Sequence, residues 1–204
     1  MADATSTTTA EIVLFPGFDE LDAIGPYEVF QNGTEAGADL ETRLVTLEPT
    51  ETVRASHGLT VVPDGTLGSP DVLVVPGGGW TTEDGGVRRV VNDGDLAEAV
   101  ATRHESGATV ASVCTGAMVL AHGGVLEGRP AVTHRVALED LEAHANVHEA
   151  RVVDDGDVLT AGGVTSGIDL ALWFLEREFS EAVATAVATE MEHERSRDVV
   201  RTRN

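Results

Sequence analysis

Short runs of apolar residues alternate along the chain with longer stretches in which apolar residues recur every three or four positions. The short runs are bounded by Gly and Pro and are typical of buried strands, whereas the longer stretches are typical of amphipathic helices. Strands that alternate with helices form parallel sheets covered on both faces, so the pattern predicts an α/β protein. Strands are predicted at residues 11–15, 40–47, 71–75, 109–113, 131–133, 150–153 and 158–161.

Helical periodicity is present at residues 22–30, 84–91, 95–105, 115–122, 165–178 and 180–194. Residues 53–63 are expected to form a small hairpin with His57 and Gly58 at its turn. Thr165 or Ser166 is placed to cap the helix that begins there.

No repeat or linker divides the chain, so residues 11–194 are predicted to form one domain, with an N-terminal tail at 1–10 and a C-terminal tail at 195–204. The N-terminal residues lack the basic flank and apolar core of a signal peptide. No apolar run reaches the roughly 18 residues of a membrane helix. We therefore expect a cytoplasmic location and no membrane contact.

Charge adds a further prediction. The chain has 35 acidic and 13 basic residues, for a formal net charge of −22, and every basic residue is Arg. Such a surface repels itself strongly at low ionic strength. The absence of Lys, with acids spread along the whole chain, predicts adaptation to a salt-rich, halophilic cytoplasm; the alternative is an ordinary acidic protein. No basic stripe is present to displace counterions, so nucleic acid is not an expected partner.

Cys114 is the single cysteine, so neither an intrachain disulfide nor a multi-cysteine zinc site can form. It lies where a predicted strand turns directly into a predicted helix, among the small residues Ala111, Ser112, Gly116 and Ala117. A turn of this kind lifts one side chain above the sheet edge. The start of the helix is expected to favour the thiolate, which makes Cys114 a candidate nucleophile. The alternative is a buried spectator.

Other segments are expected to meet Cys114 at the carboxyl edge of the sheet. Gly77 and Gly78 follow a strand and allow backbone N–H groups to approach a ligand, and the N–H groups of Gly78 and Thr115 are predicted to stabilise negative charge on a substrate. Asp22 lies in an apolar segment, and His134 can reach the edge of the site. Surface positions are expected for His57, His104, His144, His148 and His193. His122 ends the helix that follows Cys114, where a cation suits the helix dipole, and no pair of histidines has metal-ligand spacing.

Several motifs together resemble the ThiJ/PfpI superfamily of the class I glutamine amidotransferase-like clan. They occur in order over residues 11–193, nearly the whole chain. The matching passages are Leu14-Phe15-Pro16-Gly17, Leu21-Asp22, Gly25-Pro26-Tyr27-Glu28-Val29-Phe30, Val75-Pro76-Gly77-Gly78-Gly79, Ser112-Val113-Cys114-Thr115-Gly116-Ala117, Thr133-His134 and the run from Leu159 to Asp169.

The resemblance implies a flavodoxin-like three-layer α/β/α sandwich, a homodimer, a small-molecule substrate, and neither a metal nor an organic cofactor. Within the superfamily, the sequence resembles the isonitrile hydratase branch most closely, and two residues carry this resemblance. Thr115 stands where protease-like and chaperone-like relatives carry His, and Asp22 stands in a Leu-Asp motif where many relatives carry Glu. True amidotransferases need a late His and Glu, and the segment after Leu159 has no His before His193.

By this resemblance, the Cys114 thiolate attacks the terminal carbon of an isonitrile, Asp22 transfers protons, and the Thr115 and Gly78 N–H groups orient the adduct. Water then releases an N-substituted formamide. A glyoxalase or deglycase acting on methylglyoxal-type aldehydes is the alternative enzyme, and a redox-sensing or chaperone-like stress protein is an alternative of another class. Relatives that regulate transcription carry an added helix-turn-helix domain, which is not expected in a chain that ends at Asn204.

Overall fold

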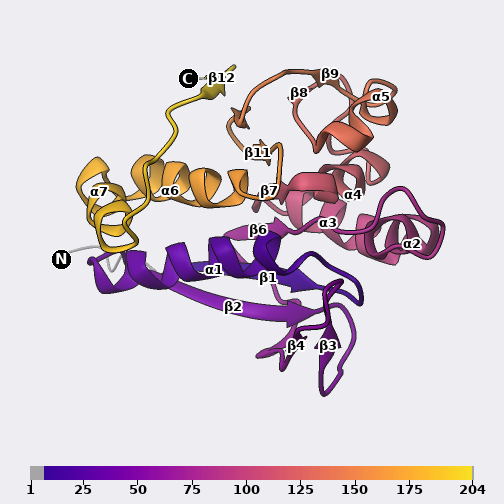
Figure 1. The fold of residues 1–204 in the computed structure, drawn as a ribbon, viewed down its shortest axis with the longest axis horizontal. Helices are drawn as coiled ribbons and strands as arrows, with labels where there is room; N and C mark the ends of the chain where they lie inside the picture. The colour runs from indigo at the N-terminus through magenta and orange to yellow at the C-terminus, as the bar shows by residue number, and fades with distance from the viewer. Residues whose placement is uncertain (1–6, 204) are drawn as a thin grey trace.

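The computed structural model describes residues 7–203. Eight strands form one sheet in the order β12-β10-β11-β7-β6-β1-β2-β5, with parallel neighbours except for the antiparallel pair β10 and β11 (Figure 1). The strands of this sheet are β1 (Thr8–Leu14), β2 (Leu40–Thr46), β5 (Gly65–Thr66), β6 (Val72–Val75), β7 (Thr109–Val113), β10 (Val152–Asp154), β11 (Val158–Ala161) and β12 (Val199–Arg201).

Two groups of helices flank the sheet (Figure 1). In one group α1 packs against α6 and α7, and in the other α2, α3 and α4 pack on one another. The predicted mostly parallel α/β/α architecture is confirmed. The helices are α1 (Glu20–Glu35), α2 (Gly86–Asp93), α3 (Asp95–Glu105), α4 (Ala117–His122), α5 (Leu138–Leu141), α6 (Ser166–Glu178) and α7 (Glu181–Glu190).

The central strands are apolar on both sides because helices cover both faces of the sheet. All four residues of β6 and all four of β11 are buried. Within residues 7–203, no helix combines the length and apolar content that crossing a bilayer requires.

Helix α1 is longer than the periodicity predicts. The Asp19 side chain accepts a hydrogen bond from the Leu21 N–H and caps the helix, which then continues past Phe30 to Glu35. Gly33 would ordinarily weaken a helix. Here it allows close packing of α1 on α6, since a Cβ at Gly33 would lie 2.8 Å from Leu175 Cδ2. Tertiary packing therefore extends the helix beyond the local signal.

Two short ladders lie outside the main sheet. β3 (Val53–Arg54) and β4 (Thr60–Val61) form the predicted antiparallel hairpin. β8 (Pro130–Ala131) pairs in parallel with β9 (Asn146–Val147). The prediction of a strand at 131–133 is therefore wrong beyond Ala131, because Thr133 turns toward the elbow at Cys114 instead of continuing a ladder.

The chain ends differ from the predicted tails. β1 begins at Thr8, whereas residues 1–6 of the predicted N-terminal tail lie outside the described residues. Within 195–204, β12 pairs in parallel with β10 along the edge of the sheet. Thr165 occupies the N-cap position of α6, but its side chain makes no capping hydrogen bond.

Candidate active site

Cys114 directly follows β7 and begins a three-residue 3-10 turn, Cys114–Gly116, which leads into α4. Its φ of +57° lies in the left-handed region, which is uncommon for a residue with a side chain and marks a strained turn. Gly116 makes the turn possible, because a Cβ there would collide with the Val75 carbonyl oxygen. The predicted nucleophile elbow is present.

Asp22, in the first turn of α1, faces this elbow and is fully buried. Its Oδ2 accepts a hydrogen bond of 3.0 Å from the Gly77 N–H, which orients the carboxyl group. Its Oδ1 has no hydrogen-bond partner among the described residues, yet the carboxyl and the Cys114 thiol lie close enough to alter each other's pKa. One carboxyl oxygen is therefore left to exchange a proton at the thiol.

Burial and charge set the proton affinities of this pair. Burial, aided by the negative charge of Asp19, raises the pKa of Asp22 from 3.8 to about 7, although the Gly77 N–H and the thiol oppose the rise. Burial, followed by the negative charge of Asp22, raises the pKa of the Cys114 thiol, and the Thr115 N–H offsets only part of that. Each ionised group disfavours ionisation of the other, so the two groups titrate as a pair.

The expectation that the following helix favours the Cys114 thiolate is therefore wrong for the resting site. The Cys114–Gly116 turn and α4 are both short, and burial together with the Asp22 carboxylate outweighs their influence. The thiolate becomes accessible when Asp22 holds the proton, because the neutral carboxyl removes the repulsion and can donate a hydrogen bond to sulfur.

The glycine loop after β6 also differs from the prediction. Gly78 was expected to offer its N–H to a substrate, but this N–H donates to Thr115 Oγ1 at 3.0 Å. The Gly77 N–H is likewise occupied by Asp22. A side chain at Gly77 could not fit, since a Cβ there would lie 2.6 Å from the Thr115 N atom. The loop thus positions Asp22 and Thr115, and the Thr115 N–H faces the sulfur.

His134 lies next to the elbow. The Thr133 hydroxyl and the His134 backbone N–H both donate to the Cys114 carbonyl oxygen, at 2.8 and 3.3 Å. The His134 Nδ1 accepts from the Val136 N–H at 3.3 Å. Burial and the nearby Arg135 charge lower the pKa of His134, although the negative charge of Asp19 opposes this, and the lowered pKa favours the neutral ring. The structure thus brings His134 beside the elbow, in backbone contact with the nucleophile.

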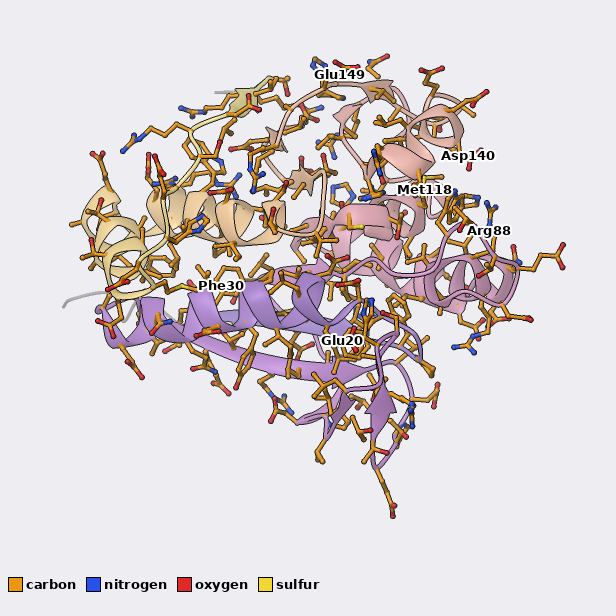
Figure 2. The ribbon with its side chains drawn as sticks, viewed as in Figure 1. Glu20, Phe30, Arg88, Met118, Asp140 and Glu149 are labelled. Carbon is orange, nitrogen blue, oxygen red and sulfur yellow. The ribbon has the colours of Figure 1, made fainter. Side chains whose placement is uncertain are left out.

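Three neighbouring residues were not among the predicted site residues. Asp19 adds negative charge that raises the pKa values of Asp22 and Cys114. Glu20, at the start of α1 beside the hairpin (Figure 2), lies 2.8 Å from His57 Nδ1. Partial burial opposes ionisation of Glu20, but its hydrogen bonds to His57 and backbone N–H groups lower its pKa to about 2. Nothing local in the sequence indicates a pair separated by 37 positions.

The ligand atoms of Asp19, Glu20 and His57 lie within 4.8 Å of one another. Among residues 7–203, this is the one group of three with spacing suited to a metal ion. Glu20 is already satisfied by His57 and by backbone N–H groups, so the arrangement is accounted for as an ion pair that fastens the hairpin to α1.

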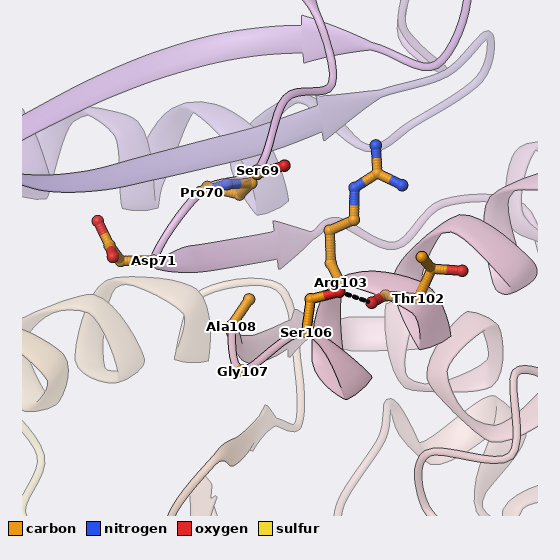
Figure 3. Close-up of a pocket in the computed structure, with 8 residues that line it drawn as sticks. All are labelled: Ser69, Pro70, Asp71, Thr102, Arg103, Ser106, Gly107 and Ala108. Carbon is orange, nitrogen blue, oxygen red and sulfur yellow. Dashed lines mark hydrogen bonds between the residues drawn. The ribbon is translucent and has the colours of Figure 1, made fainter.

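A cavity of about 390 Å³ lies at the amino ends of β6 and β7, the edge of the sheet opposite to Cys114 (Figure 3). The polar groups that line it form hydrogen bonds with other parts of the protein. Asp71 accepts hydrogen bonds from Thr9, and Arg103 donates to the carbonyls of Gly68 and Leu67. Chemistry at Cys114 cannot use this cavity.

Comparisons with known proteins agree with this geometry. The profile of the DJ-1/PfpI family matches residues 8–177. Isonitrile hydratase of Pseudomonas putida is 32% identical over 185 residues, which cover 89% of this chain and 76% of that protein. Protein DJ-1alpha of Drosophila melanogaster is 26% identical over 189 residues, covering 89% of this chain and 82% of that protein.

Among solved structures, a THiJ/PfpI family protein from Pseudomonas syringae superposes with a TM-score of 0.81 at 25% identity, over 93% of this chain and 76% of that one. The family match and the structural superposition both cover the part of the chain that contains the elbow at Cys114. The chain belongs to the DJ-1/PfpI family.

Proposed function

We propose that this protein is a cysteine-dependent hydratase that converts isonitriles into N-substituted formamides. The observation that carries the proposal is the buried Asp22 carboxyl beside Cys114, because a pKa of about 7 allows it to both accept and release a proton near neutrality. The similarity to Pseudomonas putida isonitrile hydratase supports the choice of substrate.

The first half of the reaction forms a covalent adduct. The thiol proton passes to Asp22, and the Cys114 sulfur forms a bond to the terminal carbon of R–NC. Asp22 then returns the proton to that carbon, which gives a thioimidate, Cys–S–CH=N–R. The Thr115 N–H lies beside the sulfur and is placed to orient the adduct.

Hydrolysis completes the cycle. Water adds to the C=N bond, with one water proton passing through Asp22 to nitrogen. The C–S bond then breaks, the sulfur leaves as thiolate and regains its proton, and R–NH–CHO is released. The sum is R–NC plus water, so no oxidant, metal or organic cofactor enters the balance.

Two alternatives use the same cysteine. A glyoxalase or deglycase acting on methylglyoxal-type aldehydes needs the same thiolate and acid. The similarity to DJ-1 proteins is the reason to test this activity as well. A redox sensor or chaperone-like protein is less well supported, because burial and a raised thiol pKa slow oxidation of Cys114. A homodimer, a cytoplasmic location and halophilic adaptation remain predictions.

The deciding experiment measures turnover of p-nitrophenyl isocyanide and of methylglyoxal by one preparation in high salt, with Cys114→Ser as the control. The proposal requires formamide production that depends on Cys114. Turnover of methylglyoxal alone would establish the alternative enzyme, and turnover of neither would favour a sensor or chaperone-like role.

A further inference from the structure

A second cavity, of about 360 Å³, lies beside the elbow. Thr133 and His134, which hold the Cys114 carbonyl, form part of its wall. The loop after β11, at Gly162 and Gly163, forms another part. The volume is within the range of small-molecule sites, and the cavity adjoins the segment that carries the nucleophile.

The polar lining of this cavity is unusual for this chain. Arg135, at the start of the 3-10 turn Arg135–Ala137, lines it together with His134 and His148. Acids outnumber arginines 35 to 13 in the sequence, and most described arginine side chains contact a carboxylate, a carbonyl or an aromatic ring. Within residues 7–203, Arg54 and Arg135 are the two whose guanidinium groups have no such partner, and both side chains are exposed to solvent.

Geometry also makes His134 a hydrogen-bond donor toward a ligand. Its Nδ1 accepts from the Val136 N–H, so a neutral ring carries its proton on Nε2. A guanidinium with no protein partner and an imidazole N–H on one wall are complementary to a carboxylate, since Arg presents donors in a planar fork that matches carboxylate geometry.

We propose that the substrate carries a carboxylate, which binds in this cavity at Arg135 and His134 while its electrophilic carbon reacts at Cys114. The inference rests on the proposed function for the nature of the reacting group. It assigns to Arg135 a role in specificity: the local positive charge offsets the repulsion that a surface of net charge −22 exerts on an anion.

Glu149 carries a negative charge in the same cavity, so its effect on anion binding should be opposite to that of Arg135. It lies between β9 and β10 at the edge of the molecule (Figure 2) and lines the same cavity, exposed to solvent. Its charge opposes binding of an anion, so removing it must act in the direction opposite to removal of the Arg135 charge. A merely structural role for either residue does not produce effects of opposite sign.

The test compares alkylation of Cys114 by iodoacetate and by iodoacetamide, which are similar in size and differ in charge. Cys114 is the only cysteine, so the alkylation rate of the whole protein reports this site. The ratio of the two rate constants cancels changes in thiolate content, because both reagents consume the same thiolate. Arg54→Gln is the matched control, since it removes an equal charge from an arginine that also lacks a partner.

Arg135→Gln should lower the iodoacetate-to-iodoacetamide ratio by about threefold to fivefold, as expected for one charge near a partly enclosed site. Glu149→Gln should raise the ratio, and Arg54→Gln should leave it unchanged. A ratio that Arg135→Gln does not change, or that Arg54→Gln lowers as much, overturns the proposal.

Substrate selectivity provides the second readout. The wild-type kcat/KM for isocyanoacetate and for 4-isocyanobenzoate should each be divided by the value for the corresponding methyl ester, and Arg135→Gln should lower at least one quotient. If isonitriles react but neither quotient nor the alkylation ratio changes, the carboxylate inference alone fails. If the alkylation ratio responds but no isonitrile reacts, the anion site stands and the hydratase assignment fails.

Discussion

Replacement of Asp22 by Asn should stabilise the folded protein at pH 8 while it removes activity. The side chain is fully buried, and its pKa rises from 3.8 to about 7. A group whose pKa is higher in the folded state binds its proton more tightly there, so the unfolded state is favoured progressively as pH rises from about 4 to about 7. At about 1.36 kcal/mol per pH unit, the wild-type protein is destabilised by roughly 4 kcal/mol above pH 7.

An Asn side chain does not ionise, and its amide oxygen can still accept from the Gly77 N–H. The stability advantage of Asp22→Asn should therefore be small near pH 4 and should increase by about 2 to 3 kcal/mol between pH 5 and pH 8. Urea denaturation of both proteins in concentrated KCl measures this difference. Asp39→Asn, a change at an exposed acid, controls for the general effect of removing one negative charge.

Two further measurements on the same variant separate chemistry from folding. Loss of the Asp22 charge should lower the pKa of Cys114 and speed its alkylation by iodoacetamide at pH 8. Turnover should fall by a factor of about 10² to 10⁴, because the amide cannot pass on a proton. A stability advantage of Asp22→Asn that is equal at pH 5 and pH 8 would refute the raised pKa of Asp22. Full turnover by this variant would show that Asp22 takes no part in the reaction.

The remaining predictions concern the nucleophile, the turn and the surface. Cys114→Ser should fold but retain less than about a tenth of wild-type turnover, a barrier increase above roughly 1.4 kcal/mol, as measured by steady-state kinetics beside circular dichroism. Greater activity would place the chemistry elsewhere. Gly116→Ala should destabilise the fold by about 3 kcal/mol or more in urea denaturation, since the new methyl group meets the Val75 carbonyl oxygen; a loss below about 1 kcal/mol would show that the turn can relax. The Tm should rise steeply with KCl between 0.01 and 1 M, over which the screening length falls from about 30 to about 3 Å. A flat curve would contradict the salt-adapted surface.

The elbow and the acid could be predicted because their signals are local. Small residues around Cys114 and the apolar residues around Asp22 are visible in a few consecutive positions, and the order of the motifs indicates the fold. The direction of the Gly78 N–H could not be predicted, because it depends on the Thr115 hydroxyl, 37 positions away. The raised pKa of Cys114 is a property of burial and a neighbouring helix, which local sequence does not show.

Longer-range pairing explains the other differences. The extension of α1 depends on the fit of Gly33 against Leu175. β12 forms because it pairs with β10, where Val199 and Val200 lie opposite Val152 and Val153. A strand of three residues is too short for its periodicity to predict it from the sequence.

The attachment of the cavity wall to the elbow has a consequence for redesign. The β8–β9 ladder stands outside the main sheet, and the contacts described here join it to Cys114 through the Thr133 hydroxyl and the His134 main chain. The side chains of this segment that line the cavity, those of Arg135, Leu138, His148 and Glu149, can therefore be varied with Thr133 and His134 kept as the anchor. Ala137 and Leu141 are fully buried, and Asp140 accepts a hydrogen bond from Trp80, so these three must be kept as well. Libraries at the four cavity-lining positions would alter which molecules reach the sulfur and leave the catalytic turn intact.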